Sequence, residues 1–480
     1  MEKHFKDRKT KIVCTIGPSS NTPEMLEKMA EQGMDIARLN FSHGAHEDHL
    51  KIIEAIKKIN ETREIPIGII LDTKGPEIRT GKFKEPVILE AGNTVILTTE
   101  ELEWCTKEKI YVNYKNLQNI VKKGSLVFIA DGSVELKVEE VKGNEVVCKV
   151  VVSSEVNTKK NVNVPNVFVD LPAISEQDIS DIEFGIKNGI DFIAQSFVKK
   201  AEDVLAVKEI LLRNNAKHVH IIAKIESFEG LQNLDEIIEV SDGIMVARGD
   251  LGVQIPIESI PTVQKRIIKK CNVRGKPVIT ATQMLESMIK NPRPTRAEAT
   301  DIANAIFDGT DAIMLSGETA SGKHPLRVIE FMDKIARHAE KSMIMSKHIW
   351  IEDFRKDEKG DIAEAISSSV CQTACDLEAG AIISCTFSGH TARQISKHRP
   401  LVPIIAVTPN EDEFKKLLLV WGVKPILIRN PKNTDDLVEL ALSIAKSKKL
   451  VEVGEKVVIT AGIPFNVPGN INLMKVKVIE

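Results

Sequence analysis

Short apolar runs alternate with amphipathic patterns along most of the chain. The segments between most of the runs repeat apolar residues every three or four positions, as in Glu47–Ile59, which is typical of helices that bury one face. The runs have the length of buried strands and lie at Lys11–Ile16, Asp35–Phe41, Ile67–Asp72, Asp191–Val198, Val219–Glu226, Gly243–Arg248, Pro277–Thr282 and Ala312–Ser316. Eight strand–helix units in succession predict an α/β fold of the (β/α)8, or TIM-barrel, type.

The third unit of this alternation is interrupted by a long insertion. Between Thr73 and about Asp170 the helical period disappears, and strand patterns follow with hairpin signals at Asp131-Gly132 and Gly143-Asn144. Loops after barrel strands lie on the face that carries the active site in TIM-barrel enzymes. We therefore predict a small inserted β-barrel domain that acts as a lid.

A second α/β region follows the barrel. The charged stretch Glu352–Gly360 marks the boundary, and strands and helices then alternate again. The predicted elements are helices Asp361–Glu378 and Thr434–Lys448 and strands Ala381–Thr386, Ile404–Thr408, Pro425–Arg429, Val457–Thr460 and Lys475–Val478. The predicted domains are the barrel at residues 1–73 and 171–345, the lid at 74–170, and a C-terminal three-layer α/β domain at 346–480.

Composition and charge exclude several classes of function. The 480 residues are 42% hydrophobic and 28% charged, with a formal net charge of -3, so nothing favours nucleic acid or an anionic membrane as a partner. The Lys-rich start lacks the apolar segment of a signal peptide, and no apolar stretch approaches the roughly 18 residues of a membrane span. The seven cysteines are scattered, and Cys371 and Cys375 lack a second pair for a zinc site. We expect a cytoplasmic protein with reduced thiols.

The fifth and sixth strand-like runs end in charged residues. Lys224 and Glu226 are two positions apart, so in a strand their side chains point to the same side, and we expect Asp250 at the end of the next strand. An ammonium group beside two carboxylates suits a phosphate or enolate bound together with a divalent cation. Taken alone, the two segments fit a structural ion-pair cluster at a barrel rim equally well.

Other strand ends add polar groups to the same predicted rim. Four residues offer hard oxygen ligands for an alkali or alkaline-earth ion, namely Asn40, Ser42, Asp72 and Thr73. Arg38 and Arg79 offer planar guanidinium groups that suit phosphate, and Thr282 offers a hydroxyl group. A single Asn or Thr at a strand end is more often a helix cap. Five polar clusters at one rim of one barrel are not explained by capping and favour an active site.

Seven segments resemble signature stretches of the pyruvate kinase family. They read ARLNFSHG, LDTKGPEIRTG, VPNVFVDLPAISEQD, AKIES, MVARGDLG, TATQMLESM and LSGETASGKHP, in that family's order and across nearly the whole chain. The resemblance implies a glycolytic enzyme that transfers the phosphoryl group of phosphoenolpyruvate to ADP, giving pyruvate and ATP. It also implies Mg²⁺ (or Mn²⁺) and K⁺ as cofactors, and a cytoplasmic homotetramer whose C-terminal domain serves regulation and assembly.

The resemblance also assigns roles to residues of the barrel rim. Lys224 matches the lysine that stabilises the transferring phosphoryl group and the enolate, and Arg38 matches the arginine on the substrate phosphate. The remaining matches are the Mg²⁺ ligands Glu226 and Asp250, the K⁺ ligands Asn40, Ser42, Asp72 and Thr73, the carboxylate cradle of Gly249, Asp250 and Thr282, and the nucleotide contacts Arg79, Lys160, Asn40 and His43. A water held near Thr282 is our hypothesis for the proton donor to the enolate.

Three positions refine this resemblance. The family often reads VNLPG where this chain has VNVPN at residues 162–166, and VEIP where it has VQIP at residues 253–256; neither change touches a direct ligand. A glutamate at the position of Glu77 accompanies a K⁺ requirement in the family, and a lysine there accompanies independence from K⁺. A solvated hinge residue is the alternative interpretation of Glu77.

A candidate effector site follows the first strand of the C-terminal domain. Hydroxyl groups and backbone amides at the start of a helix can bind phosphate, although a plain helix cap explains them too. The residues are Thr386, Ser388, Gly389, His390 and Thr391. In the resembling family this position holds the phosphate of a sugar-phosphate activator. We expect a sugar phosphate or a nucleotide monophosphate as activator, and its identity stays open because the later segment Thr460–Phe465 lacks the Trp or Arg that would favour a bisphosphate.

Two other functions remain open. A barrel aldolase could use Lys224 as a Schiff-base nucleophile, although two neighbouring carboxylates argue against the desolvated lysine that this needs. A non-catalytic sugar-phosphate sensor could share the scaffold, although it would be expected to have lost a ligand. Gly317–Lys323 fits the start of a P-loop, but His324 replaces the required Ser or Thr, so a turn after the eighth strand is the better interpretation.

Overall fold

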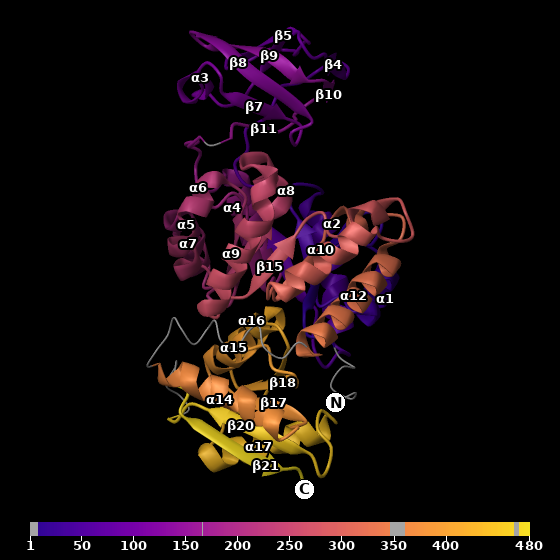
Figure 1. Cartoon of the computed structure of the whole chain (residues 1–480), viewed down its shortest axis with the longest axis vertical. Helices are drawn as coiled ribbons and strands as arrows, with labels where there is room; N and C mark the ends of the chain where they lie inside the picture. Colours follow the sequence, from indigo (N-terminus) through magenta and orange to yellow (C-terminus); the bar gives the residue numbers. More distant parts are fainter. Residues whose placement is uncertain (1–7, 166, 346–360, 465–469) are drawn as a thin grey trace.

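The computed structural model describes residues 8–165, 167–345, 361–464 and 470–480. Three bodies are stacked along the long axis of the molecule, with the β-rich lid at one end, the barrel in the middle and the C-terminal α/β domain at the other end (Figure 1). The stretch Glu352–Gly360, which we predicted as a boundary, lies outside the described residues, as does Phe465.

The middle body is a closed barrel of eight parallel strands, which confirms the predicted fold class. Around it the strands run in the order β1 (Lys11–Ile16), β16 (Ala312–Leu315), β15 (Val278–Ala281), β14 (Gly243–Ala247), β13 (His220–Ile225), β12 (Phe192–Gln195), β3 (Gly68–Asp72) and β2 (Ile36–Asn40). They are buried almost throughout, as expected for parallel strands covered on both faces. The apolar runs overshoot several strands by a residue or two, because the runs include the first turn residues.

Helices surround this barrel and alternate with its strands. The principal ones are α1 (Pro23–Gln32), α2 (His46–Asn60), α4 (Glu176–Lys187), α5 (Ala201–Arg213), α7 (Leu234–Val240), α9 (Ile260–Val273), α10 (Arg296–Phe307) and α12 (Pro325–Met345). Three short helices, α6 (Phe228–Gln232), α8 (Arg248–Gln254) and α11 (Gly317–Ala320), follow strand ends directly. The motif Gly317–Lys323 therefore forms α11 and its turn, as the sequence favoured.

The barrel core has two layers because strand side chains alternate in direction. Ile12 packs outward against the helices, in one buried cluster with Leu26 and Met29 of α1. The next residue, Val13, points into the barrel and packs with Phe192. Apolar side chains thus fill most of the barrel interior, and polar side chains gather at its two ends.

The lid consists of two sheets with a buried core of their own. One sheet has the order β11 (Val162–Asn163), β7 (Leu126–Ile129), β8 (Val134–Lys142), β9 (Glu145–Val152), β5 (Thr94–Thr98) and β6 (Lys109–Tyr111); the other pairs β10 (Ser154–Val156) with β4 (Val87–Leu89). The short helix α3 (Leu117–Ile120) lies between β6 and β7 of the larger sheet. The tight turns between β7 and β8 and between β8 and β9 confirm the two hairpin signals.

The C-terminal domain is a five-stranded sheet with helices on both faces. Its strand order is β19 (Val423–Leu427), β18 (Ile404–Thr408), β17 (Ala381–Cys385), β20 (Lys456–Ala461) and β21 (Leu473–Val478), with β21 antiparallel to β20. Its helices are α14 (Ile362–Asp376), α15 (His390–Lys397), α16 (Glu411–Lys416) and α17 (Thr434–Ser447). Separate apolar clusters cover the two faces, which gives the predicted three layers.

This domain packs against the end of the barrel where the strands begin. Nζ of Lys11, the first residue of β1, donates to the carbonyl of Val423 at 2.9 Å. Lys416 of α16 pairs with Asp242, just before β14, at 2.8 Å. The lid and the C-terminal domain therefore lie at opposite ends of the barrel (Figure 1). All seven cysteines are free thiols, and no helix in the described ranges is long and apolar enough to cross a membrane.

Candidate active site

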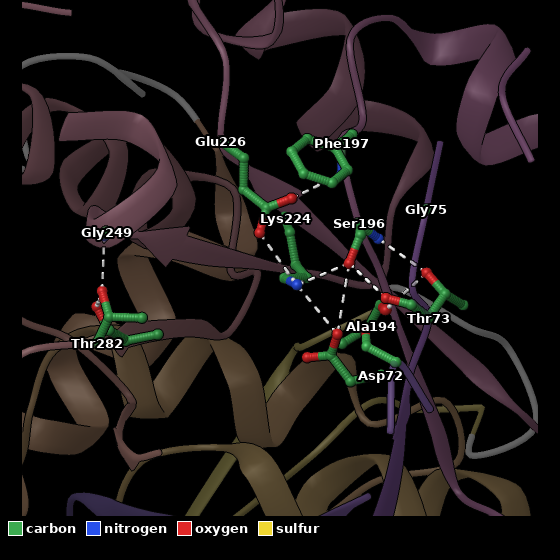
Figure 2. A network of polar contacts seen from close by, with 12 residues as sticks. Asp72, Thr73, Gly75, Ala194, Ser196, Phe197, Lys224, Glu226, Gly249 and Thr282 are labelled. Atoms are coloured by element: carbon green, nitrogen blue, oxygen red, sulfur yellow. Dashed lines mark hydrogen bonds and ion pairs between the residues drawn. The ribbon is translucent and has the colours of Figure 1, made fainter. Parts of the chain in front are cut away.

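Lys224 lies at the centre of a buried polar cluster where the barrel strands end. Its Nζ is 3.0 Å from Oδ1 of Asp72, 3.0 Å from Oε1 of Glu226 and 2.7 Å from Oγ of Ser196 (Figure 2). Only 8% of Lys224 is exposed. An ammonium group has three hydrogens to donate, and here it faces three acceptors. The predicted proximity of Lys224 and Glu226 is therefore present in the structure.

The charges of this cluster stabilise one another. Burial by itself lowers the pKa of Lys224, but the carboxylates of Asp72 and Glu226 outweigh burial and raise the pKa above its ordinary value. Burial likewise opposes ionisation of Asp72, but Arg38 and Lys224 hold the pKa of Asp72 below its usual value. Burial raises the pKa of Glu226, with Lys224 acting against it. The carboxylates of Asp72 and Glu226 thus favour the charged form of Lys224.

Arg38 reaches the same cluster from β2, the strand next to β3, which carries Asp72. Its Nε lies 2.6 Å from Oδ2 of Asp72, and its NH1 donates to Oγ1 of Thr15 at 2.9 Å. Asp72 therefore stands between two cations, with one carboxylate oxygen on each. Both cations lie at the rim where a phosphate would have to bind, and Arg38 is 9% exposed.

Glu226 and Asp250 come from different kinds of element. Glu226, immediately after β13, is 1% exposed, and its Oε2 accepts from the backbone amide of Phe197 at 2.7 Å. Asp250 lies in the first turn of α8, because β14 already ends at Ala247. The prediction that Asp250 lies at a strand end was therefore wrong. Burial raises the pKa of Asp250.

These two carboxylates supply only part of a metal site. Within the described residues, no group of three or more His, Cys, Asp or Glu side chains is arranged to hold a metal ion. A pair of carboxylates nevertheless suits Mg²⁺, which usually binds through one or two carboxylates and completes its shell with water and substrate phosphate. The donor chemistry of Glu226 and Asp250 therefore fits a divalent cation shared with a substrate.

Thr282 joins two loops of the rim in a strained conformation. Its φ is +67°, which is unusual for a β-branched residue, and Gln283 follows at +55°. Its Oγ1 accepts from the amide of Gly249 at 2.8 Å and donates to the carbonyl of Ala281 at 2.6 Å (Figure 2). The Gly249 amide and the Thr282 hydroxyl group, both expected to contact a substrate carboxylate, are thus hydrogen-bonded to each other.

The family of the chain follows from comparison with known proteins. Residues 7–329 match the family model described as "Pyruvate kinase, barrel domain", and residues 364–477 match "Pyruvate kinase, alpha/beta domain". The chain belongs to the pyruvate kinase family. The Clostridium acetobutylicum protein named "Pyruvate kinase" is 48% identical over 98% of this chain and 100% of its own length. A relative of the same name from Staphylococcus epidermidis is 50% identical over 98% of this chain and 80% of its own length.

A solved structure supports the same assignment. The crystal structure of a pyruvate kinase from Cryptosporidium parvum superposes with a TM-score of 0.90 at 42% sequence identity. The superposed region includes 100% of this chain and 98% of the Cryptosporidium parvum chain. The similarity therefore includes the lid and the C-terminal domain as well as the barrel.

Of the four residues matched to the K⁺ ligands of pyruvate kinases, Asn40 and Asp72 end the adjacent strands β2 and β3, and Ser42 and Thr73 follow those strands. Asn40 and Asp72 are paired in register, and Oδ1 of Asn40 accepts from the amide of Ser42 at 3.2 Å. Oγ1 of Thr73 accepts from the amide of Ser196 at 3.0 Å. Strand pairing brings the four residues to one side of the rim, where they offer the oxygen atoms that such an ion prefers.

The four residues matched to nucleotide contacts divide between lid and barrel. Arg79 donates from Nε to Oε2 of Glu77 at 2.8 Å and from NH1 to the carbonyl of Lys159 at 2.8 Å. Lys160 lies beside it, where its carbonyl accepts from the amide of Thr80 at 2.8 Å. The other two, Asn40 and His43, belong to β2 and the loop after it.

The residues matched to the effector site lie in the C-terminal domain, far from Lys224. Residues 386–389 connect β17 to α15, which begins at His390. Gly389 has a φ of +68°, and the carbonyl of Ser388 accepts from NH2 of Arg393 at 3.1 Å. Thr386 and Thr391 are buried. The strand–turn–helix geometry that the sequence predicted for this segment is therefore present.

Three residues of the barrel rim were missed by the sequence interpretation. Ser196 touches Lys224 and Thr15 touches Arg38; each lies inside or at the end of one of the apolar runs, so the rule that selected Asp72 would have selected them too. Arg248 donates to the carbonyl of Thr282 at 2.6 Å and pairs with Asp301 at 2.7 Å. Arg248 is held by Asp301 of α10, and nothing in the sequence indicated that α10 lies next to this rim.

Proposed function

We propose that the protein transfers the phosphoryl group of phosphoenolpyruvate to ADP, giving pyruvate and ATP. The observation that carries this proposal is the buried cluster of Lys224, Arg38 and Asp72, which holds two cations at one rim of the barrel. Phosphoryl transfer needs little covalent help from a protein, and positioning and charge stabilisation supply most of the catalysis. Membership of the pyruvate kinase family supports the same reaction.

Lys224 and Arg38 have distinct roles in this proposal. Arg38 binds the phosphate of phosphoenolpyruvate through its planar guanidinium group. Lys224 neutralises charge that develops on the transferring phosphoryl group and on the enolate oxygen. Asp72 fixes both side chains before the substrate arrives, since one of its oxygens contacts each cation. The preformed arrangement means that little reorganisation is needed during the reaction.

Metal ions would complete the charge balance of the site. Glu226 and Asp250 would hold Mg²⁺ or Mn²⁺, and Asn40, Ser42, Asp72 and Thr73 would hold K⁺. When bound, these ions would supply further positive charge beside the phosphoryl oxygens. Glu77 supports the K⁺ requirement, because a carboxylate at this position cannot supply a positive charge itself.

The carboxylate of phosphoenolpyruvate would lie against the start of α8. The backbone amides of Gly249 and Asp250 and the hydroxyl group of Thr282 are the proposed contacts, and the Gly249–Thr282 hydrogen bond supports their proximity. A water molecule near Thr282 would then protonate the enolate. Arg79 and Lys160 of the lid, with Asn40 and His43 of the barrel, would contact the nucleotide.

The C-terminal domain would regulate and assemble the enzyme. The segment from Thr386 to Thr391 would bind a sugar phosphate or a nucleotide monophosphate as activator, which the strand–turn–helix geometry supports. Four copies of the chain would form a closed homotetramer in the cytoplasm, as the family resemblance implies. Light scattering at micromolar concentration tests the assembly, and a monomer would contradict it.

Two observations argue against the alternative functions. A Schiff-base lysine must lose its proton readily, whereas carboxylates raise the pKa of Lys224. A non-catalytic sensor would not need the clustered cations and carboxylates that the rim retains. The test is a coupled assay of pyruvate formation from phosphoenolpyruvate and ADP, with and without Mg²⁺ and K⁺. Failure to form pyruvate, or trapping of a keto acid on Lys224 by borohydride, would contradict the proposal.

A further inference from the structure

The two linkers of the lid meet at a single buried carboxylate. Asp178, in the first turn of α4, is fully buried. Its Oδ1 accepts from the backbone amides of Lys74 at 3.0 Å and Gly75 at 3.2 Å, where the chain leaves the barrel for the lid. Its Oδ2 accepts from the amide and the hydroxyl group of Ser175, at 3.1 and 2.5 Å, where the chain returns.

This arrangement is more than a helix cap. An acidic residue at the third position of a helix commonly accepts from the backbone of its own cap, as Asp48 does with Ala45 at the start of α2. Asp178 makes that bond with one oxygen and uses the other on two amides 103 and 104 residues earlier in the chain. Hydrogen bonds to an ionised and buried carboxylate are among the stronger ones in proteins.

Gly75 is held from its other side as well. Its φ is +72°, and a Cβ atom there would lie 2.9 Å from Cβ of Ser196 and 2.8 Å from Cδ2 of Phe197. The first linker is thus confined between Asp178 and the loop after β12. Ser196 also touches Nζ of Lys224 at 2.7 Å, so the base of the linker is continuous with the candidate active site (Figure 2).

We infer that Asp178 is the positioning residue that fixes both lid linkers to the barrel and thereby sets where the lid delivers Arg79. Arg79 follows Gly75 by four residues, and its guanidinium group is bonded to Glu77 of the same linker, so the position of the linker sets where Arg79 starts from. In one respect the inference rests on the proposed function, namely the contact of Arg79 with the nucleotide. Phosphoenolpyruvate binds to barrel residues and does not depend on the lid in this account.

Asp178→Asn is the informative change. An amide group has one acceptor oxygen and one NH₂ donor, so the donor must face either the amides of Lys74 and Gly75 or the amide of Ser175. In either orientation one linker loses its acceptor. Lid closure then places Arg79 less accurately, and the nucleotide, not phosphoenolpyruvate, is bound less well.

The test uses the full chain, with steady-state kinetics and calorimetric binding of phosphoenolpyruvate in the presence of Mg²⁺. Asp178→Asn is expected to raise the KM for ADP by about 5-fold or more, because one of the two linkers loses a hydrogen-bond acceptor and Arg79 is held less firmly. The Kd for phosphoenolpyruvate should change by less than about twofold. The matched control is Asp48→Asn, the same substitution at the same helix position. It affects only a cap bond of α2 and an exposed ion pair with Lys51, so it should leave the KM for ADP within about twofold.

Four outcomes would overturn the inference or separate it from the proposed function. An unchanged KM for ADP in Asp178→Asn, or an equal rise in Asp48→Asn, overturns it. Arg79→Ala serves as the reference: if this variant also leaves the KM for ADP unchanged, the nucleotide contact itself is wrong. If Asp178→Asn does not fold, Asp178→Glu decides, because it keeps the charge but moves the carboxylate by one methylene; wild-type kinetics in that variant would contradict the role of Asp178.

Discussion

Nζ of Lys224 lies 3.0 Å from Oδ1 of Asp72, although their strands β13 and β3 are not neighbours in the barrel. Strand β12 lies between them, and the two side chains meet because both point into the mouth of the closed barrel. The ion pair is buried, so it keeps the ammonium group charged and immobile before any substrate is present.

Metal binding should depend on the two carboxylates near Lys224. Glu226→Gln or Asp250→Asn removes one negative ligand, so the Mg²⁺ concentration needed for half-maximal activity should rise about 10-fold or more, with partial rescue by excess Mg²⁺ or Mn²⁺. Titration of activity with Mg²⁺ measures this. Glu258→Gln, at a position outside the cluster, is the control. Titration curves that match the wild type in both cluster variants would refute the assignment.

Potassium dependence should be controlled by Glu77. Replacing K⁺ by a large organic cation should lower activity at least ~10-fold, because one charge near the phosphoryl group contributes more than ~1.4 kcal/mol to transition-state stabilisation. Glu77→Lys should restore part of the activity without K⁺. Since Glu77 also pairs with Arg79, the same variant should raise the KM for ADP. Full activity of the unmodified protein without K⁺, Na⁺ and ammonium would show that Glu77 is only a hinge residue.

Acid should destabilise the protein partly through His220. Burial, followed by the charge of Lys416, lowers the pKa of His220 from 6.5 to about 4. The unfolded chain therefore binds a proton between these values that the folded chain does not, so stability falls as the pH drops from about 6.5 to about 4. His220→Gln should reduce the difference in unfolding free energy between pH 7 and pH 4.5 by about 2–3 kcal/mol, measured by urea titration. An identical acid response in variant and wild type would contradict the buried neutral imidazole.

Activation by a phosphorylated metabolite should depend on the turn before α15. Ribose 5-phosphate and AMP are suitable probes, and one of them should lower the apparent KM for phosphoenolpyruvate. Thr386→Ala combined with Ser388→Ala removes two hydroxyl groups from the proposed phosphate site and should abolish that effect. Retained activation in the double variant would place the effector elsewhere.

The barrel was predictable from local patterns, because each buried strand forms a separate apolar run and each surrounding helix carries its own period. The order of strands in the lid was not, since pairs such as β5 with β9 join distant segments through non-local contacts. The strand-end rule found Lys224, Glu226 and Asp72. It misplaced Asp250, because the chain turns into α8 directly after Ala247.

Other features of the site depend on tertiary structure alone. The positive φ of Thr282 is held by tertiary contacts, among them the hydrogen bond from Arg248 to its carbonyl oxygen. From the sequence, Asp178 could not be distinguished from an ordinary capping residue of α4. The partners of its second oxygen are the amides of Lys74 and Gly75, which lie far away in the sequence at the start of the lid. Such contacts require knowledge of which loops the closed barrel brings together.

The central claim is that Lys224 stabilises charge that develops during phosphoryl transfer, and the kinetics of Lys224→Met test it most directly. The change removes the ammonium group and keeps much of the side-chain volume, whereas Lys74→Met, at an exposed position near the same rim, is the control. We predict that Lys224→Met lowers kcat by about 1,000-fold or more while the affinity for phosphoenolpyruvate changes little. A raised KM with normal kcat would contradict the account.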